Sequence, residues 1–464
     1  MTVTDWLETP GLPRTLLCEL DYLDGDEVKT CYLADRAFTS KPDDTPANTP
    51  YDEYILDQPV FIQRMGLFGS RSTAATSMQL SPQPELEFLL DVNIYRQPVR
   101  FYLGDETWSK SAFIPIATGV GDTVGASLSE YEVRLRHHDG VLDSQIETGV
   151  FESGPNKDKP MPCCIGQCFN VTPVLEDSAL HQYRVHYSAV EAITEVRDAG
   201  VPVSVTVDLQ AGTFRLNQAP VGEITCDVKG AVSGSWLSSP AGILNWLLSL
   251  VGATPGTVNL PEWTVGIFLR EPATVLEVVE RVTASCRGYW YFDREGRFHA
   301  KQFALGTAQS ALLPDDINDN GLNIIQTLEP KHKVTVNFAR NYTAQTNLAG
   351  SVDAESRARY QEAYSATSQD IALSGYPNAE ALYLDTDLSN QADADALKAL
   401  LAEECKQRRR IYALTINTKP FSYQLGESHT FIYPGLGLSD GKTGVITAVT
   451  DDPLNEEATV ELWA

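Results

Sequence analysis

Three closely spaced cysteines are the residues whose type and spacing best suit metal chemistry. They lie in Cys163-Cys164-Ile-Gly-Gln-Cys168, and thiolates bind zinc and iron–sulfur clusters. Such sites need about four soft ligands, and only three are close together in this segment. Adjacent residues of an extended segment point to opposite faces, so Cys163 and Cys164 reach one ion only if the backbone is distorted. We therefore predict no metal site and no cofactor, keep these three cysteines as the iron–sulfur candidates, and expect buried thiols.

Two further polar clusters contain metal-binding residue types without the spacing of a site. His137-His138-Asp139-Gly140 holds two imidazoles, but neighbouring strand residues diverge and Asp-Gly is typical of a hairpin turn. Asp315, Asp316 and Asp319 offer carboxylates suited to calcium, but the twelve-residue calcium-loop pattern is not met. We expect both clusters to be turn or loop residues.

One segment matches the nucleophile pattern of serine hydrolases. Gly437-Leu-Ser-Asp-Gly441 fits G-x-S-x-G, but that motif needs a helix after the serine, whereas a strand is expected from Gly444. Asp-Gly between two strands favours a hairpin turn. The overlapping Gly441-Lys-Thr443 lacks the first glycine and the helix of a phosphate-binding loop. Adjacent acidic pairs are typical of solvated loops, so we predict that the protein is not an enzyme.

The charge balance limits the classes of partner. The 464 residues include 35 Lys and Arg against 62 Asp and Glu, a formal net charge of −27. This excess disfavours specific nucleic-acid binding, because phosphate neutralisation needs clustered cations. The one strong basic cluster is Lys406-Gln-Arg-Arg-Arg410. We expect it to complement the C-terminal end of a helix on a solvated surface, with a subunit contact as the next option.

The sequence also indicates a cytoplasmic site of synthesis. Eight cysteines in so long a chain do not form a disulfide framework. The first residues lack the basic region of a secretory signal. The longest nearly apolar run, Gly242 to Ala253, is too short to span a bilayer, so we predict no membrane span.

Turn residues and composition divide the chain into four predicted domains. An N-terminal β-barrel domain spans 1–152, and Gly149 to Pro162, with three prolines, is the linker after it. A β-rich insertion domain spans 163–228 and an α+β helix–hairpin domain spans 229–330. A C-terminal β-barrel domain with a long helix spans 331–464. The predicted fold class is mainly β with α+β insertions: multidomain, with two tube-like β-barrel domains plus smaller α+β modules.

Three helices and one aromatic hairpin are predicted within these domains. A helix begins near Ala241, and a second begins with Pro272 in its first turn and stops at Gly288. The hairpin Tyr289 to Lys301 is expected to pack its aromatic rings on the valine stripe of that second helix, rather than to form a ligand platform. A third helix of about twenty residues is capped by Ser389 or Asn390. Leu86 to Asn93 fits either a strand or a short helix.

Two distant segments follow the same pattern. Each has a Leu-Gly-acid turn, a Gly-Val strand start and a final strand alternating as V-x-L. These are Leu103-Gly-Asp105, Gly119-Val120 and Val133-Arg-Leu135 in one segment, and Leu425-Gly-Glu427, Gly444-Val445 and Val460-Glu-Leu462 in the other. We interpret the pair as a duplication, with common turn chemistry as the alternative. Three copies of such a chain would present six similar barrels.

Several segments together resemble the baseplate hub or tail-tip proteins of long, flexible-tailed bacteriophages, and are similar to the hubs of tail-derived gene-transfer particles. The segments are Asn93 to Asp105, Pro160 to Pro173, Tyr183 to His186, Val190 to Val201, Ala211 to Leu216, Ile224 to Gly230, the helix–hairpin at 272–301 and the C-terminal barrel. The resemblance covers nearly the whole chain. It implies a homotrimeric ring of barrels with inserted α+β modules. Some tail-tip proteins hold an iron–sulfur cluster, for which Cys163, Cys164 and Cys168 lack a visible fourth ligand.

The resemblance also implies partners and a location. We expect a structural protein of the virion, at the tail tip or baseplate, assembled in the host cytoplasm. Its ring would join the sixfold tail tube to a threefold tip and gate the channel for DNA and the tape-measure protein. Distal tail or tail-tube proteins and a central fibre or tip protein are the implied neighbours. The alternatives are a receptor- or glycan-binding tail tip, using exposed aromatics such as Trp108, and a tail-associated cell-wall hydrolase.

Overall fold

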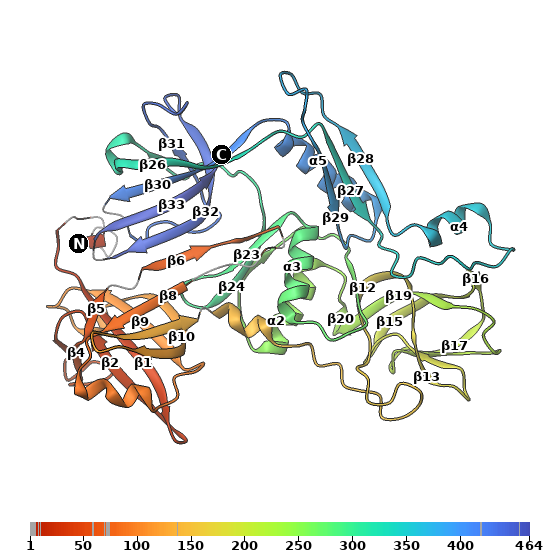
Figure 1. The fold of residues 1–464 in the computed structure, drawn as a ribbon, viewed down its shortest axis with the longest axis horizontal. Coiled ribbons are helices and arrows are strands. Elements are labelled where there is room, and N and C mark those ends of the chain that lie inside the picture. The colour runs from red at the N-terminus through yellow and green to blue at the C-terminus, as the bar shows by residue number, and fades with distance from the viewer. Residues whose placement is uncertain are drawn as a thin grey trace.

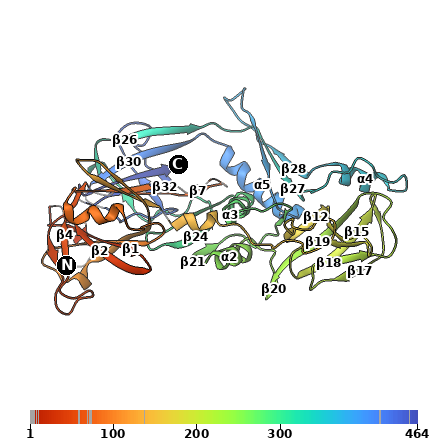
Figure 2. The same cartoon turned by 60° about the horizontal axis from the view of Figure 1, so that its bottom comes forward.

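The computed structural model describes residues 6–7, 9, 11–57, 60–68, 70, 75–136, 138–417, 420–453 and 455–464. The protein is mainly β with few helices, which confirms the predicted fold class, and one sheet is nearly closed like a barrel. The two largest sheets lie at one end of an elongated molecule, and the inserted modules extend toward the other end (Figures 1 and 2). None of the helices in the described part of the chain has the length and apolar character that a membrane crossing requires.

The N-terminal sheet has nine strands in the order β3-β4-β2-β1-β9-β10-β11-β8-β5. Its strands are β1 (Thr15–Asp24), β2 (Glu27–Ala34), β3 (Phe38–Thr39), β4 (Pro50–Glu53), β5 (Ile55–Asp57), β8 (Ala75–Leu80), β9 (Pro98–Gly104), β10 (Ile114–Ala126) and β11 (Tyr131–Arg136). Alternating apolar residues of β1 and β9 fill its core, as period-two patterning requires. The segment that fits either strand or helix is a 3₁₀ helix, Pro84–Leu90.

The C-terminal sheet has the order β25-β31-β32-β33-β30-β26, and β6 pairs with β32 off this path. Its strands are β25 (Ala311–Leu312), β26 (Ile317–Leu328), β30 (Arg409–Asn417), β31 (Ser428–Phe431), β32 (Lys442–Asp452), β33 (Glu457–Trp463) and β6 (Phe61–Arg64). The four strands predicted for the last segment are thus confirmed. The Asp440-Gly441 turn is also confirmed, because it joins β31 to β32 and the Gly441 N–H donates to the Leu438 carbonyl at 3.0 Å.

Five antiparallel strands of each sheet have the same order, which confirms the predicted repeat. The first repeat is β5-β8-β11-β10-β9, and the second repeat is β26-β30-β33-β32-β31. Both repeats also run through these strands in the same chain order. The two strands with the V-x-L pattern, β11 and β33, are each the third strand in this order and pair with β10 and β32, respectively.

The matching hairpins share a β-bulge at the same place. Asp122 in β10 and Thr447 in β32 are each an extra residue without an opposite partner. The register partners around the bulges are Gly121 with Leu135 and Thr123 with Arg134 in the first repeat, and Ile446 with Leu462 and Ala448 with Glu461 in the second. Because a bulge fixes register and increases local twist, the two sheets are alike in detail as well as in topology.

The turn before each hairpin is also shared, but the sequence-based alignment of this turn is wrong. Leu103 and Gly104 end β9, whereas Leu425 and Gly426 precede β31, so the two Leu-Gly-acid turns are not equivalent. The equivalent of Gly426 is Arg96: their N–H groups donate to Ile446 and Gly121, respectively, both at 2.9 Å. Both have left-handed backbone, with φ of 84° and 61°. The sequence alignment missed this match because position 96 is an arginine, although a left-handed backbone favours glycine.

Two sheets form the inserted β-rich region. The six-stranded sheet comprises β12 (Cys163–Val171), β15 (Val190–Asp198), β16 (Val201–Pro202), β19 (Ile224–Ser233), β20 (Ser235–Trp236) and β22 (Gly266–Leu269). The four-stranded sheet comprises β13 (Val174–Asp177), β14 (Gln182–Arg184), β17 (Val205–Asp208) and β18 (Thr213–Leu216). The predicted linker from Gly149 to Pro162 contains no helix or named strand, only an isolated bridge.

The helix–hairpin module packs as predicted, although its helix bounds differ. Its elements are α2 (Pro240–Val251), β21 (Thr254–Asn259), α3 (Val275–Ser285), β23 (Gly288–Phe292), β24 (Arg297–Gln302) and β7 (Gly66–Leu67), which pairs with β23. The helix α3 starts at Val275 because Thr274 caps it, accepting from the Glu277 N–H at 3.2 Å. Pro272 therefore lies outside the helix, and Gly288 starts β23 instead of ending α3.

The last module is inserted between β26 and β30. It contains β27 (Lys333–Phe338), α4 (Ala354–Gln361), β28 (Ser365–Asp370), β29 (Ala381–Asp385) and α5 (Gln391–Cys405). Asn390 caps α5, as predicted. The helix is shorter than expected because Arg409 and Arg410 of the basic cluster belong to β30. Lys406 pairs with Glu403 at 2.5 Å, so part of the cluster is neutralised on the surface.

Several pairings cross the predicted domain boundaries. The strand β6 joins the C-terminal sheet, β7 joins the helix–hairpin module, and β22 joins the inserted six-stranded sheet. One hydrophobic core also combines β12, both helices α2 and α3, and α5. The division into four domains stays a prediction.

The shared turn gives a first prediction. A Cβ at Gly426 would lie 1.9 Å from the Tyr289 hydroxyl oxygen, so Gly426→Ala should lower the free energy of unfolding by on the order of 2 kcal/mol through strain and overpacking. The matched control is Arg96→Gly at the equivalent position, which should change it by less than about 1 kcal/mol. Urea unfolding followed by tryptophan fluorescence measures both. If Arg96→Gly lowered the free energy of unfolding as much as Gly426→Ala does, the equivalence of the two turns would be contradicted.

Candidate functional site: the junction between the two repeats

The three candidate cysteines are divided between two cores. Cys163 packs in the core with α2 and α3, whereas Cys164 and Cys168 pack on the opposite face of β12. This confirms the expected divergence of Cys163 and Cys164. All three are fully buried, and burial raises the pKa of the Cys163 and Cys164 thiols. Among the described residues, no group of three His, Cys, Asp or Glu side chains is arranged to hold a metal. The absence of a cofactor stays a prediction.

The other chemistry-bearing clusters have structural contacts. His138 to Asp143 form a 3₁₀ helix, so the predicted hairpin turn at Asp139 is wrong; His137 lies outside the described residues. The His138 ring shares a 2.8 Å hydrogen bond with the Thr118 hydroxyl. Asp316 accepts from the Leu313 N–H at 2.9 Å and so caps the 3₁₀ helix Pro314–Asp316. The side chain of Asp319 lies outside the described residues.

The aromatic candidates are packed rather than displayed. Trp290 is fully buried and stacks on Phe298 with ring centroids 5.8 Å apart, which confirms packing over a ligand platform. Trp108 is half-buried and its ring lies 4.8 Å from that of Trp6. Part of the Trp108 side chain is therefore occupied by this contact, and its use by a receptor- or glycan-binding tail tip stays a prediction.

The feature that sequence patterns did not indicate is a junction between the two repeats. After β5, the chain leaves the N-terminal sheet, and β6 pairs antiparallel with β32 of the C-terminal sheet, from Arg64 opposite Ala448 to Phe61 opposite Asp451. Arg64 donates to the Glu461 carboxylate of β33 at 2.8 Å. This pairing is non-local, and the short run Phe61–Arg64 carries no signal for its partner.

An aromatic cluster fills the junction. Phe61 is 5% exposed, and its ring centroid lies 5.3 Å from that of Phe101 and 5.8 Å from that of Phe421. These rings come from β6, from the first repeat and from the segment before β31, respectively. Edge-to-face and tilted ring pairs of this kind stabilise by roughly 0.5–1.5 kcal/mol beyond the area they bury.

A buried ion pair completes the junction. The Arg294 guanidinium, from the β23–β24 turn, pairs with the Asp451 carboxylate of β32, which is 1% exposed. Arg294 also donates to the Phe421 carbonyl at 3.2 Å and lies over the Phe421 ring at 4.7 Å. Asp451 accepts from the Phe421 N–H at 2.6 Å. Burial raises the pKa of Asp451, and Arg294 opposes that rise.

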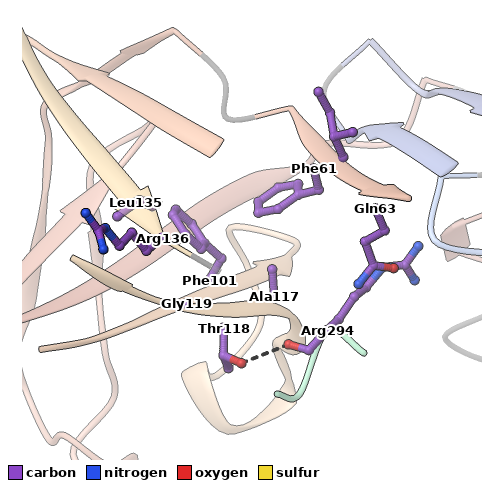
Figure 3. A pocket seen from close by; sticks show the side chains of 10 residues that line it. Phe61, Gln63, Phe101, Ala117, Thr118, Gly119, Leu135, Arg136 and Arg294 are labelled. Carbon is purple, nitrogen blue, oxygen red and sulfur yellow. Dashed lines mark hydrogen bonds between the residues drawn. The ribbon is translucent and has the colours of Figure 1, made fainter. Parts of the chain in front are cut away.

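A small cavity lies beside this cluster (Figure 3). Phe61 and Phe101 line it, and the Thr118 hydroxyl donates to the backbone oxygen of Arg294 at 2.9 Å. Its volume of about 40 Å³ suits water, whereas small-molecule sites measure roughly 300–1,000 Å³. The junction is therefore suited to fixing the two repeats relative to each other rather than to binding a substrate.

Removing the buried charge should loosen the junction. Asp451→Asn leaves the Arg294 guanidinium, whose side chain is 18% exposed, without its counter-ion, so the free energy of unfolding should fall by about 1–3 kcal/mol. Glu461→Gln, which breaks the pair with the half-exposed Arg64, is the control and should cost at most about 1 kcal/mol. Chemical denaturation measures both variants, and similar costs would show that the buried pair has no special role.

A third prediction concerns His186, which contacts the backbone of Cys164. The His186 Nδ1 accepts from the Cys164 N–H at 3.0 Å, and burial, with a contribution from Arg184, lowers the pKa of His186 to about 4. The unfolded chain then binds the proton more readily, so stability present above pH ~6.5 is lost as the pH falls toward 4.

The loss attributable to His186 should be about 3 kcal/mol. His186→Gln keeps an acceptor and cannot titrate, so its stability should fall less between pH 6.5 and 4 than that of the unaltered chain. His332→Gln, at an exposed histidine, is the control and should follow the unaltered chain. Parallel pH profiles for His186→Gln and the unaltered chain would contradict the assignment.

Comparisons with known proteins return tail components. No family model and no curated protein sequence matches the chain. Among solved structures, a 43 kDa tail protein of prophage MuSo2 from Shewanella oneidensis is 9% identical, with a TM-score of 0.45 over 97% of this chain and 98% of that one. A tail protein from Neisseria meningitidis MC58 is 9% identical, with a TM-score of 0.45 over 97% of each chain. A chain of the native gene transfer agent virion is 11% identical, with a TM-score of 0.45 over 70% of this chain and 91% of that one. These similar structures are tail and virion components.

Proposed function

We propose that this protein is a structural hub or tail-tip protein of a phage tail, located in the virion, in which three copies form a ring. The observation that carries the proposal is the repeat, whose two halves share strand order, register and bulge position. Each copy of the chain contains two similar sheets, so a ring of three copies presents six similar positions. Such a ring can bind a neighbour that has sixfold symmetry. The proposed ring thus joins a sixfold tube to a threefold tip.

The junction supports this adaptor role. Six positions around a ring are equivalent only if the two repeats of each chain keep a fixed angle. The strand β6, the ring cluster at Phe61 and the ion pair between Arg294 and Asp451 hold that angle. A packed, hydrogen-bonded junction of this kind transmits strain instead of bending.

The charge supports a channel role. A net charge of −27 repels phosphate, so an acidic ring wall would let DNA and a tape-measure protein pass without binding. The partners we propose are a homotrimer of this chain, tail-tube or distal tail proteins on one side, and a central fibre or tip protein on the other. We propose no catalytic role.

The mass of the purified protein tests the proposal. Native mass spectrometry should give three times the 51.0 kDa chain mass, and images of the ring should show threefold symmetry with six similar densities. A monomer at micromolar concentration, or an assembly whose copy number is not a multiple of three, would contradict the adaptor role. Glycan binding by a monomer would favour a receptor-binding tip, and clearing of cell-wall substrate in a gel would favour a hydrolase.

A further inference from the structure

The second repeat shows what covers the outer edge of its bulged strand. Along β32, residues 442–445 pair with β31 and residues 448–451 pair with β6. The strand β6 comes from the first repeat, so this part of the edge is covered by the neighbouring repeat. The pairing thus shows how one repeat can contact the next.

In the described part of the chain, no strand pairs with the equivalent edge of the first repeat. Along β10, residues 114–120 pair with β9, and residues 123–126 correspond to residues 448–451 of β32 when the bulges are superimposed. Within the described residues, Thr123 to Ala126 pair with β11 alone. Thr123 and Ala126 are exposed, and the nearby Leu128 side chain is completely exposed. An open strand edge with an exposed leucine is a template for another strand.

The second repeat contains a strand equivalent to β6. Ile55 of β5 and Ile317 of β26 face the equivalent residues Leu80 and Ile416. Both segments begin I-x-D, and counting forward without a gap places Ile62 of β6 level with Ile324 of β26. These two isoleucines are 38% and 37% exposed.

The outer edge of β26 is free in the part of the chain that the structure describes. It is the last strand of its sheet and pairs with β30 alone. Ile325, the next residue, is 50% exposed and forms a bulge in the pairing with β30, so the register can be projected only as far as Ile324. Two adjacent exposed isoleucines on an open edge strand are unusual unless a partner covers them.

We propose that β26 of one copy pairs antiparallel with the open edge of β10 in the next copy, as β6 pairs with β32 inside the chain. The projected register places Ile324 opposite Gly125 and Asn323 opposite Ala126. The occupant is a second copy of this chain, and the inference rests on the proposed ring. Each copy offers one edge of each kind, so the contact is head-to-tail and closes when three copies complete the circle.

Cysteine cross-linking between copies tests the contact. The double variant Ala126→Cys and Asn323→Cys places thiols directly opposite each other, with Cβ atoms about 4.5–5.5 Å apart. On mild oxidation it should form covalent dimers and trimers, at least tenfold more than the unaltered chain with its eight native cysteines. Each single variant alone should stay at the background level.

Two further pairs calibrate the reaction. Ile62→Cys with Thr450→Cys, at partners already opposite within the chain, should form a disulfide inside one chain and no covalent trimer. Thr123→Cys with Asn323→Cys is displaced by three residues, roughly 10 Å along the strand, and should cross-link at least tenfold less than the matched pair. Stronger cross-linking of this displaced pair would overturn the proposed register.

The outcomes separate this inference from the proposed function. A trimer by mass that does not cross-link at the matched pair overturns the β26–β10 contact and leaves the ring in place. A monomer by mass overturns both. Cross-linking into open chains of many copies supports the contact and overturns the closed ring of three.

Discussion

Backbone hydrogen bonding between β6 and β32 is the interaction on which the arrangement of the two repeats depends. Each repeat has its own core, so without this strand the two sheets would be joined only by connecting segments and side-chain contacts. By leaving its own sheet, β6 gives the second sheet an additional strand, and it carries Phe61 into the space between them. The strand β6 thus pairs with the backbone groups at the edge of the second sheet and also fixes the angle between the two repeats.

The pair of Arg294 and Asp451 ties the second repeat to the helix–hairpin module, and the carbonyl of Arg294 accepts a hydrogen bond from Thr118 of the first repeat. An isolated carboxylate with 1% exposure is costly, and the pair tolerates burial only because the guanidinium and the Phe421 N–H both contact the carboxylate. The three partners come from the helix–hairpin module, the C-terminal sheet and the segment before β31. A shift of any one of them would leave a charge without its partner, so the pair favours one relative placement over its neighbours.

Features that depend on a local sequence pattern could be predicted from the sequence. Period-two alternation located the strands of both hairpins, and the divergence of Cys163 and Cys164 followed from their adjacency in an extended segment. Helix bounds and turns were harder to predict. For example, α3 begins after its cap Thr274, and Pro272 lies outside the helix. Arg96 concealed the match to Gly426. The β6–β32 pairing was not predictable at all, since four residues that pair with a strand almost 400 positions away leave no periodic signal.

The two repeats differ in the length of chain between matching strands, and this difference has a geometrical consequence. The first repeat joins β5 to β8 through residues 58–74, whereas the second joins β26 to β30 through residues 329–408, which include α4 and α5. In a closed assembly of three chains, every second position would therefore carry a projecting lobe. A surface built from the strands alone would look hexagonal to a neighbour, whereas a surface bearing the lobes would look triangular.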